Sequence, residues 1–362
     1  MKVVVTGTRG IPGIQGGVET HCEHLYPLLA QMRCDVTVMR RDAYVDQTAH
    51  LESYNGVKLC DLPTYRSKHF EAALHTLLSI FRARFMSPDV LHIHAVGPCL
   101  MAPVARMMGM KVVATHHGCD YKRDKWGSVA SAIIKLGELC MVKFADRIIA
   151  VSDSIACDLE HQYGCKDKVT VIYNGVDKPV KPAGTDFIEE LGLNRKEYIV
   201  AVARFVPEKR LDQLIEAYTL LNDKCGKKLV LVGDSDHDDQ YSAQLKAKAR
   251  EAGVVLTGFI TGEKLAQVMY NAGLFVLPSV HEGLPISLLE AMSYGLDVLV
   301  SDIDACRLPE LEGTDFFKAD DVNSLRLRLR EKLEKSCPER YFNMTRYSWE
   351  QIARDTLKVY KM

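Results

Sequence analysis

The sequence predicts an α/β protein built from two doubly wound parallel sheets. Its 362 residues exceed the size of one ordinary core and suit two domains. Short, nearly continuous Val- and Ile-rich runs alternate with helix-length amphipathic segments, and this alternation occurs twice along the chain. Strands buried on both faces of a parallel sheet have such runs, and the alternation predicts helices on both faces of each sheet.

The expected strands fall into two groups. Those of the first domain cover residues 2–6, 35–39, 90–94, 111–115, 147–151 and 169–173, and those of the second cover 198–203, 228–232, 254–259, 274–277 and 298–301. Helical spacing of Leu25, Leu28, Leu29 and Met32 predicts an amphipathic helix over residues 19–33. A last helix carries one apolar face, made of Trp349, Ile352, Ala353, Thr356 and Tyr360.

A segment rich in Pro and Gly separates the two groups of strands and predicts the domain boundary. We expect residues 1–178 to form the first domain and residues 179–196 a linker. Residues 197–345 then form the second domain, and residues 346–362 the terminal helix, which packs on the first domain.

Composition excludes several classes of protein. The net charge of −1 provides no global field for nucleic acid, and the 47% apolar and 26% charged residues describe a globular chain. The eleven cysteines contain no Cys-x-x-Cys pair, which predicts buried thiols in a reduced, cytoplasmic protein. The chain starts directly with a strand, so no signal peptide is expected, and no stretch can span a bilayer.

The glycine-rich loop after the first strand permits two interpretations. Gly7, Gly10 and Gly13 fit the fingerprint of a dehydrogenase or nucleotide-sugar epimerase. Such an enzyme needs a Tyr-x-x-x-Lys pair on a helix, and both matches, Tyr54…Lys58 and Tyr121…Lys125, fall in turn or loop sequence.

The doublet Gly16-Gly17, which such a fold does not require, favours close approach of the backbone to a phosphate. The alternative is an ordinary helix-capping loop.

A second constellation follows the expected strand at residues 274–277. Pro285 suits the first position of a helix, and Gly283 and Leu284 before it leave peptide N–H groups for an anion. Glu282 precedes this helix. Glu290 lies five residues beyond Pro285, which is about 7–8 Å along the helix axis. Two carboxylates around a diphosphate site suit the hydroxyls of a nucleotide sugar, although Glu290 is alternatively a solvated helix residue.

Arg204 and Lys209 follow the end of another expected strand, at residues 198–203. Open α/β sheets bind ligands at the carboxyl ends of their strands, so these two cations can neutralise a diphosphate. Surface charges are the alternative.

These motifs together resemble the retaining glycosyltransferases of family 4 with the GT-B fold, over nearly all of the chain. Glu282 to Glu290 matches the E-x7-E element of the family, and Arg204 with Lys209 matches its R-x4-K pair. His116-His117-Gly resembles its first-domain histidine motif, Asn174-Gly-Val-Asp its pre-linker segment, and the Gly16-Gly17 loop a subgroup of bacterial surface-polysaccharide assembly.

The resemblance implies two domains facing a central cleft and transfer of a sugar from a nucleoside diphosphate to a glycan or lipid-linked acceptor. It implies Glu282, His117, Arg204 and Lys209 as catalytic residues. The implied donor-binding residues are Gly16, Gly17, Gly233, Phe259, Gly283, Leu284 and Glu290. After Gly233, Asp234 stands where relatives often carry Gly-x-Gly, so the resemblance does not carry over the exact contacts to the base.

The resemblance implies no cofactor and no metal ion, because fixed cations replace it. His92 and His94, on one face of a strand, are a pair that can ligate zinc, with packing or a polar crevice as the alternative, and the sequence indicates no third ligand.

Arg66, Lys68, Arg82 and Arg84 surround the apolar residues 77–81 and Phe85. A solvated face on a core helix is the favoured interpretation of this surface, and peripheral contact with an anionic membrane that carries a lipid-linked acceptor is the alternative. Two other functions stay open, a nucleotide-sugar-binding module without turnover and an epimerase or dehydrogenase.

Overall fold

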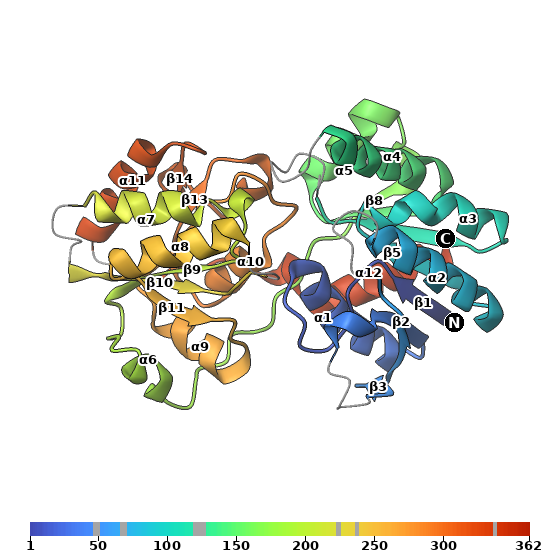
Figure 1. The fold of residues 1–362 in the computed structure, drawn as a ribbon, viewed down its shortest axis with the longest axis horizontal. Coiled ribbons are helices and arrows are strands. Elements are labelled where there is room, and N and C mark those ends of the chain that lie inside the picture. The colour runs from blue at the N-terminus through green and yellow to red at the C-terminus, as the bar shows by residue number, and fades with distance from the viewer. Residues whose placement is uncertain (46–50, 66–70, 119–127, 222–225, 236–238, 336–338) are drawn as a thin grey trace. The chain divides into compact units, whose positions relative to one another are not determined.

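The computed structural model describes residues 1–45, 51–65, 71–118, 128–221, 226–235, 239–335 and 339–362. The chain divides into two compact units: unit 1 comprises Met1–Gly175 and Tyr347–Met362, and unit 2 comprises Val176–Arg346. Each unit contains one predominantly parallel sheet with helices on both of its faces (Figure 1). The predicted α/β class is confirmed, and the C-terminal helix belongs to unit 1.

Unit 1 is built on a sheet of strand order β3-β4-β2-β1-β5-β6-β7-β8. Its strands are β1 (Lys2–Thr6), β2 (Asp35–Arg41), β3 (Ser53–Tyr54), β4 (Val57–Leu62), β5 (Val90–His94), β6 (Val112–His116), β7 (Arg147–Ala150) and β8 (Val169–Val171). Its helices are α1 (Gly17–Gln31), α2 (Glu71–Met86), α3 (Ala102–Met107), α4 (Ser128–Phe144), α5 (Asp153–Tyr163) and α12 (Trp349–Lys361).

The hairpin of β3 and β4 was not among the expected strands. Strand β4 lies near one side of the sheet, and Val57 is its only buried residue, the others being half-buried or exposed. It therefore lacks the continuous apolar run by which the other strands were found. Asn55 and Gly56 form the turn between the two strands with positive φ angles of 46° and 86°. Tyr54 and Lys58 therefore lie in a β-hairpin, and this pair does not have the helical setting that a dehydrogenase or epimerase requires.

Helices α1 and α12 pack on the same core of unit 1. Leu25, Tyr26 and Leu29 of α1 are buried there with Ile352 and Tyr360 of α12, against valines of β1, β2 and β5. The predicted apolar face of the terminal helix is confirmed, because all five of its residues are buried.

Unit 2 is built on a sheet of strand order β11-β10-β9-β12-β13-β14, in which every pair is parallel. Its strands are β9 (Tyr198–Val202), β10 (Lys228–Val232), β11 (Val255–Gly258), β12 (Leu274–Leu277), β13 (Asp297–Ser301) and β14 (Phe316–Phe317). Its helices are α6 (Asp186–Glu190), α7 (Leu211–Thr219), α8 (Gln240–Glu251), α9 (Gly262–Asn271), α10 (Ile286–Ser293) and α11 (Val322–Glu334). Helices α7, α8 and α11 share one core with the sheet (Figure 1).

The segment expected as a linker, residues 179–196, differs from the prediction because it forms part of unit 2. It contains the short helix α6, whose Ile188 is buried. The Phe187 backbone N–H donates to Gln267 Oε1 of α9 at 2.9 Å, and the Ala183 N–H donates to Glu263 Oε1, also at 2.9 Å. The Pro- and Gly-rich composition marks a boundary but does not show that the following residues dock on a helix 80 positions later.

A buried ion network ties α11 and the segment after it to the sheet of unit 2. Asp315, whose side chain is fully buried, accepts hydrogen bonds from Lys332 Nζ at 2.8 Å and from Arg340 Nη1 at 2.5 Å. Asp297, the first residue of β13, accepts from the same two cations. Burial alone would raise the pKa of Asp315, but the hydrogen bonds from Arg340, Glu312 N–H and Lys332 outweigh it and lower that pKa.

Within the described residues, no helix combines the length and the apolar character that crossing a membrane requires.

Replacing Asp315 by Ala is expected to destabilise unit 2 by about 3–5 kcal/mol, since two buried cations lose a partner. Asp302→Ala, which removes an exposed pair with Arg307, is the matched control and should cost less than about 1 kcal/mol. Because the folded-state pKa of Asp315 is lowered, its contribution is present above about pH 4 and is lost as the pH falls through the lowered value. Urea unfolding of both variants at several pH values measures this, and equal stability of the two variants would contradict the role of the network.

Candidate functional site

The residues predicted from unit 2 lie along one edge of its sheet. Because all its strand pairs are parallel, the carboxyl ends of β11, β10, β9 and β12 lie at the same edge, in that order. Phe259, Gly233, Arg204 and the loop of residues 278–285 follow these four ends in turn. The chain order reverses between β9 and β12, and open α/β sheets bind ligands at such a reversal. The structure therefore brings these candidates to one edge.

Lys209 and Glu282 form an ion pair across that reversal. Lys209 ends a short 3-10 helix, Pro207–Lys209, after β9, and its Nζ lies 2.5 Å from Glu282 Oε1 in the loop after β12. Their side chains are only 17% and 10% exposed. The Val280 backbone N–H donates to the Glu208 carbonyl at 3.0 Å, so the two loops are also joined through the backbone. A lysine ammonium has three N–H donors, so Lys209 can bind a phosphate oxygen while it keeps its ion pair with Glu282.

The loop after β12 leads directly into helix α10. Pro285 is the N-cap of α10 instead of its first residue, a shift of one position from the prediction, and its carbonyl accepts from the N–H groups of Leu288 and Leu289. Gly283 and Leu284 before it are buried, and the first N–H groups of an α-helix have no partner within the helix. Glu290 is half-buried in α10. The pKa of Tyr294, one turn later, is raised mainly by the burial of the tyrosine and further by the nearby charge of Glu290. An anion at this N-terminus would meet peptide N–H groups and a positive helix end.

The glycine loop of unit 1 contains two different kinds of glycine. Gly16 has a φ of 147°, and a Cβ there would collide with Glu19 Oε2. Glu19 is buried, and its Oε1 accepts from the Arg9 backbone N–H at 3.0 Å and from Thr8 Oγ1 at 3.3 Å. Gly17, the first residue of α1, faces open space. Gly16 is thus explained by the protein itself, whereas nothing among the described residues requires the bare backbone of Gly17.

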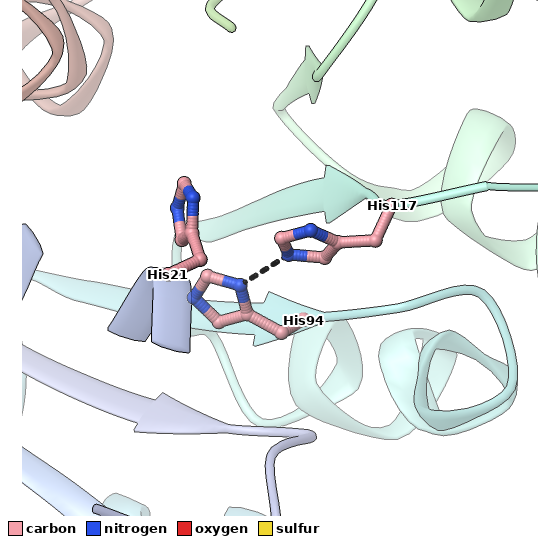
Figure 2. A group of neighbouring side chains, drawn as sticks. All are labelled: His21, His94 and His117. Carbon is pink, nitrogen blue, oxygen red and sulfur yellow. Dashed lines mark hydrogen bonds between the residues drawn. The ribbon is translucent and has the colours of Figure 1, made fainter. Parts of the chain in front are cut away.

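The structure places His117 in a cluster of histidines at the carboxyl edge of the sheet of unit 1. Its Nε2 lies 2.9 Å from Nδ1 of His94, the last residue of β5, and the two rings are stacked (Figure 2). His21 of α1 approaches the His117 ring edge-on at a centroid distance of 5.0 Å. One nitrogen from each of the three rings lies within 4.8 Å of the others.

Burial lowers the pKa of all three histidines. That of His21 falls to about 4, against a smaller opposing effect of its hydrogen bond with Asn174, and those of His94 and His117 fall well below the ordinary value. For His117 the nearby His21 and His92 lower it further. The cluster is therefore neutral at physiological pH, and its rings offer lone pairs and N–H donors to a polar ligand.

His116, next to His117, has a different environment. Its ring is fully buried, its Nε2 lies 3.0 Å from Glu138 Oε1, and its Nδ1 accepts from the Gly118 backbone N–H at 3.2 Å. These contacts orient the loop after β6, while the ring of His117 lies against His94.

Side chains from distant segments hold the histidine cluster. His21 Nδ1 bonds Asn174 Oδ1 at 3.0 Å, and Tyr26 Oη bonds His94 Nε2. Trp349 of α12 stacks on His24 and contacts the edge of His21. A Cβ on Gly175 would collide with the Trp349 ring, so the glycine of the Asn174-Gly-Val-Asp segment permits this packing.

The structure only partly matches the hypothesis that His92 and His94 form a pair of zinc ligands. The two rings stack at a centroid distance of 4.2 Å, but His92 bonds Thr115 Oγ1 at 2.7 Å and Tyr360 Oη at 2.6 Å. His94 instead meets His21 and His117. The sequence did not indicate His21, although ten of the twelve histidines precede residue 179.

The dehydrogenase or epimerase alternative finds little support at the end of β2, where a dinucleotide-binding fold carries an acidic ligand of the ribose and this chain has Arg40 and Arg41. Arg40 pairs with Asp61 at 2.6 Å and Arg41 with Glu71 at 2.9 Å, so both cations have structural partners. The pair Tyr121…Lys125 lies outside the described residues.

Comparison with known proteins identifies both halves of the chain. Residues 15–178 match the model described as Glycosyltransferase Family 4, and residues 185–347 match that of Glycosyl transferases group 1. The alpha-maltose-1-phosphate synthase of Mycolicibacterium smegmatis is 26% identical over 405 residues, covering 100% of this chain and 99% of its own. The UDP-Gal:alpha-D-GlcNAc-diphosphoundecaprenol alpha-1,3-galactosyltransferase of Escherichia coli is 30% identical over 230 residues, 60% of this chain and 58% of its own.

Solved structures share the fold over the whole chain. Sucrose-phosphate synthase from Thermosynechococcus elongatus superposes with a TM-score of 0.79 at 20% identity, covering 99% of this chain and 98% of its own. Anabaena HepE in complex with UDP-glucose has a TM-score of 0.78 at 17% identity, and the match covers 100% of this chain and 99% of its own.

The two glycines of the loop are expected to respond differently to alanine. Gly16→Ala should destabilise unit 1 by about 1–3 kcal/mol, because its φ is one that L-residues rarely adopt and its Cβ displaces the hydrogen-bonded Glu19. Gly17→Ala should leave stability unchanged or raise it by up to about 1 kcal/mol, since alanine suits the first turn of a helix. Thermal unfolding of both variants checks this, and an equal loss of stability in both would contradict the distinction.

Proposed function

The chain belongs to the family 4-like glycosyltransferases with the GT-B fold, and on that premise we propose that it moves a sugar from a nucleoside-diphosphate sugar to a hydroxyl of a glycan or lipid-linked acceptor. Glycosyl transfer in polysaccharide and glycan biosynthesis is the activity of its relatives. The observation that carries the proposed donor class is the pairing of Lys209 with Glu282 beside the N-terminus of α10, at the chain reversal of the unit 2 sheet.

In this proposal, unit 2 binds the donor. Lys209 and Arg204 neutralise the diphosphate, and the N–H groups near Gly283 and Leu284 bind its oxygens at the positive end of α10. Preorganised positive charge of this kind stabilises a departing diphosphate in the transition state. These fixed cations make a resident metal ion unnecessary for the transfer, so we expect no cofactor.

The carboxylates of unit 2 recognise the hydroxyls of the donor. Glu282, fixed by Lys209, accepts from hydroxyls of the sugar and thereby orients its anomeric carbon, while Glu290 accepts from the ribose. Gly233 and Phe259, which follow the neighbouring strands β10 and β11, contact the nucleoside. In unit 1, His117 is proposed to bind the sugar and Gly16 and Gly17 the diphosphate.

We propose that the transfer retains the anomeric configuration. The acceptor oxygen attacks the anomeric carbon on the face from which the diphosphate departs, and the proton of the acceptor hydroxyl passes to a phosphate oxygen. The new C–O bond forms as the bond to the phosphate oxygen breaks, with positive charge developing on the sugar ring. The ion pair with Lys209 supports this route, because it holds Glu282 as a hydroxyl acceptor and makes its carboxylate a poorer covalent nucleophile.

We further propose that the acceptor of this chain is lipid-linked. The relative from Escherichia coli is named for a diphosphoundecaprenol-linked acceptor and a UDP-Gal donor. Such an acceptor lies at a membrane surface, which unit 1 must then approach from the cytoplasm.

Helix α2 presents a surface that fits such contact. Leu74, Leu78, Phe81 and Phe85, here called the α2 stripe, recur at i, i+4, i+7 and i+11, and all four are exposed, Phe85 by 84%. At 3.6 residues per turn, the exposed Arg82 and Arg84 flank the two sides of this stripe. Arg66 and Lys68, predicted for the same surface, lie outside the described residues.

An apolar stripe between cations suits an anionic bilayer, in which the rings enter the headgroup region and the arginines meet phosphates. This supports peripheral membrane contact over the alternative of a fully solvated helix face, since solvated faces expose polar residues.

Transfer is tested with a panel of UDP-, GDP-, ADP- and dTDP-sugars. The bound donor should raise the melting temperature, and transfer to a glycan or lipid-linked acceptor should proceed in the presence of a chelator, giving a product whose anomeric configuration, measured by NMR, equals that of the donor. Lys209→Ala and Glu282→Ala should each lower kcat/KM about 100-fold or more, and Lys318→Ala, at an exposed ion pair, should not.

Wild-type turnover in both site variants would contradict the site, and an inverted product would contradict retention. Donor binding without transfer or hydrolysis would favour the binding module, and a changed sugar without acceptor would favour an epimerase.

Membrane contact is tested by co-sedimentation with vesicles of phosphatidylcholine, with and without phosphatidylglycerol. The protein should sediment with the anionic vesicles, and Arg82→Gln or Arg84→Gln should each weaken binding about fivefold, since one cation near an anionic surface contributes about 1 kcal/mol. Phe81→Ser with Phe85→Ser should reduce binding further, whereas Tyr341→Ser, a 95% exposed aromatic of unit 2, is the matched control. Equal sedimentation of all variants would contradict this surface.

A further inference from the structure

We propose that His21, His94 and His117 form a binding site for one divalent transition-metal ion, Zn²⁺ by its ligand chemistry, with the fourth coordination position open. Three neutral imidazoles are a ligand set that zinc takes in proteins, and a protein site with three ligands retains one position for water or another small ligand. The ion is not part of the proposed transfer reaction.

The separation of the three rings fits one ion. Zinc–nitrogen bonds of about 2.0–2.1 Å in tetrahedral geometry place ligand nitrogens about 3.4 Å apart. His94 Nδ1 and His117 Nε2 are 2.9 Å apart, and one nitrogen from each ring lies within 4.8 Å of the others. For all three rings to bind one ion, the first pair must therefore separate by about half an ångström and His21 must approach.

Outer contacts set the rings for metal binding. The Asn174 Oδ1 atom can only accept, so His21 Nδ1 donates to it at 3.0 Å and Nε2 is left as the lone-pair nitrogen of that ring. Tyr26 Oη bonds His94 Nε2, on the far side of the ring from the Nδ1 that faces His117. Metal-ligating histidines usually have such a partner on the second nitrogen, which fixes ring orientation.

The three ligands come from separate, well-packed segments. His94 ends a central strand, β5, His117 follows β6, and His21 lies in the first turns of α1 (Figure 2). Trp349 packs against His21, and both His21 and His94 are buried. Ligands fixed by the scaffold lose little freedom when an ion binds, which favours affinity.

One consequence rests on the proposed function. His117 is there assigned to the donor sugar, and an ion on its Nε2 would remove that nitrogen from the sugar. Zinc bound at the cluster should then inhibit transfer, and chelation should restore it.

The proposal is tested on the full chain after chelator treatment and dialysis, by titration with Zn²⁺ in a calorimeter and with Co²⁺ in a spectrometer. We expect one ion per chain, and for Co²⁺ the intense visible absorption of a tetrahedral site. His94→Gln and His21→Gln should each weaken binding at least tenfold, and Asn174→Ala about 10–100-fold. His161→Gln, an exposed histidine of α5, is the matched control and should bind as the wild type.

Circular dichroism verifies that each variant folds. If one of the two ligand variants fails to fold, the other still tests the site. Binding that is absent in the wild type, or that survives in the folded ligand variants, would overturn the proposal. Because the absorption and heat signals do not depend on turnover, loss of metal binding leaves the proposed transfer intact, and absence of transfer with normal metal binding overturns only the proposed function.

Discussion

Parallel strand pairing is the constraint on which both candidate sites depend. When strands run in one direction, their carboxyl ends meet at one edge, and residues that follow them become neighbours regardless of sequence distance. Lys209 and Glu282 are 73 positions apart and form an ion pair for this reason. In unit 1 the same constraint brings His94, at the end of β5, to His117, which follows β6.

The candidate site of unit 1 also depends on hydrogen bonds to its buried histidines, and these bonds come from several distant segments. The histidines of unit 1 lie in an interior where an unpaired polar atom is costly, and partners from α1, β6 and α12 meet that requirement. Tyr360 bonds His92, and Trp349 covers His21 and His24, so the terminal helix takes part in the cluster as well as in the apolar core. A network connected in this way holds its rings in defined positions, which both sugar recognition and metal binding require.

The charges of the two units are used differently. In unit 2, Lys209 and Glu282 pair at a half-buried edge, where a phosphate can join the existing pair. In unit 1, the cluster is polar but uncharged at physiological pH, because burial keeps its imidazoles neutral. The edge of unit 2 therefore suits an anion, and the histidines of unit 1 suit an uncharged polar group.

The sequence by itself determined the class of fold, eleven of the strands to within two residues and the apolar face of α12, because these depend on local periodicity of side chains. It also indicated Arg204, Lys209 and Glu282 as candidates, since glycines, prolines and charges after a strand have a local physical meaning, whereas His117 was implied by the resemblance to the family. Only the tertiary structure decided that β4 joins the sheet, that residues 179–196 dock on α9, and that His94 meets His21 and His117 as well as His92. Those outcomes depend on which distant segments come together, and local periodicity carries no information about that.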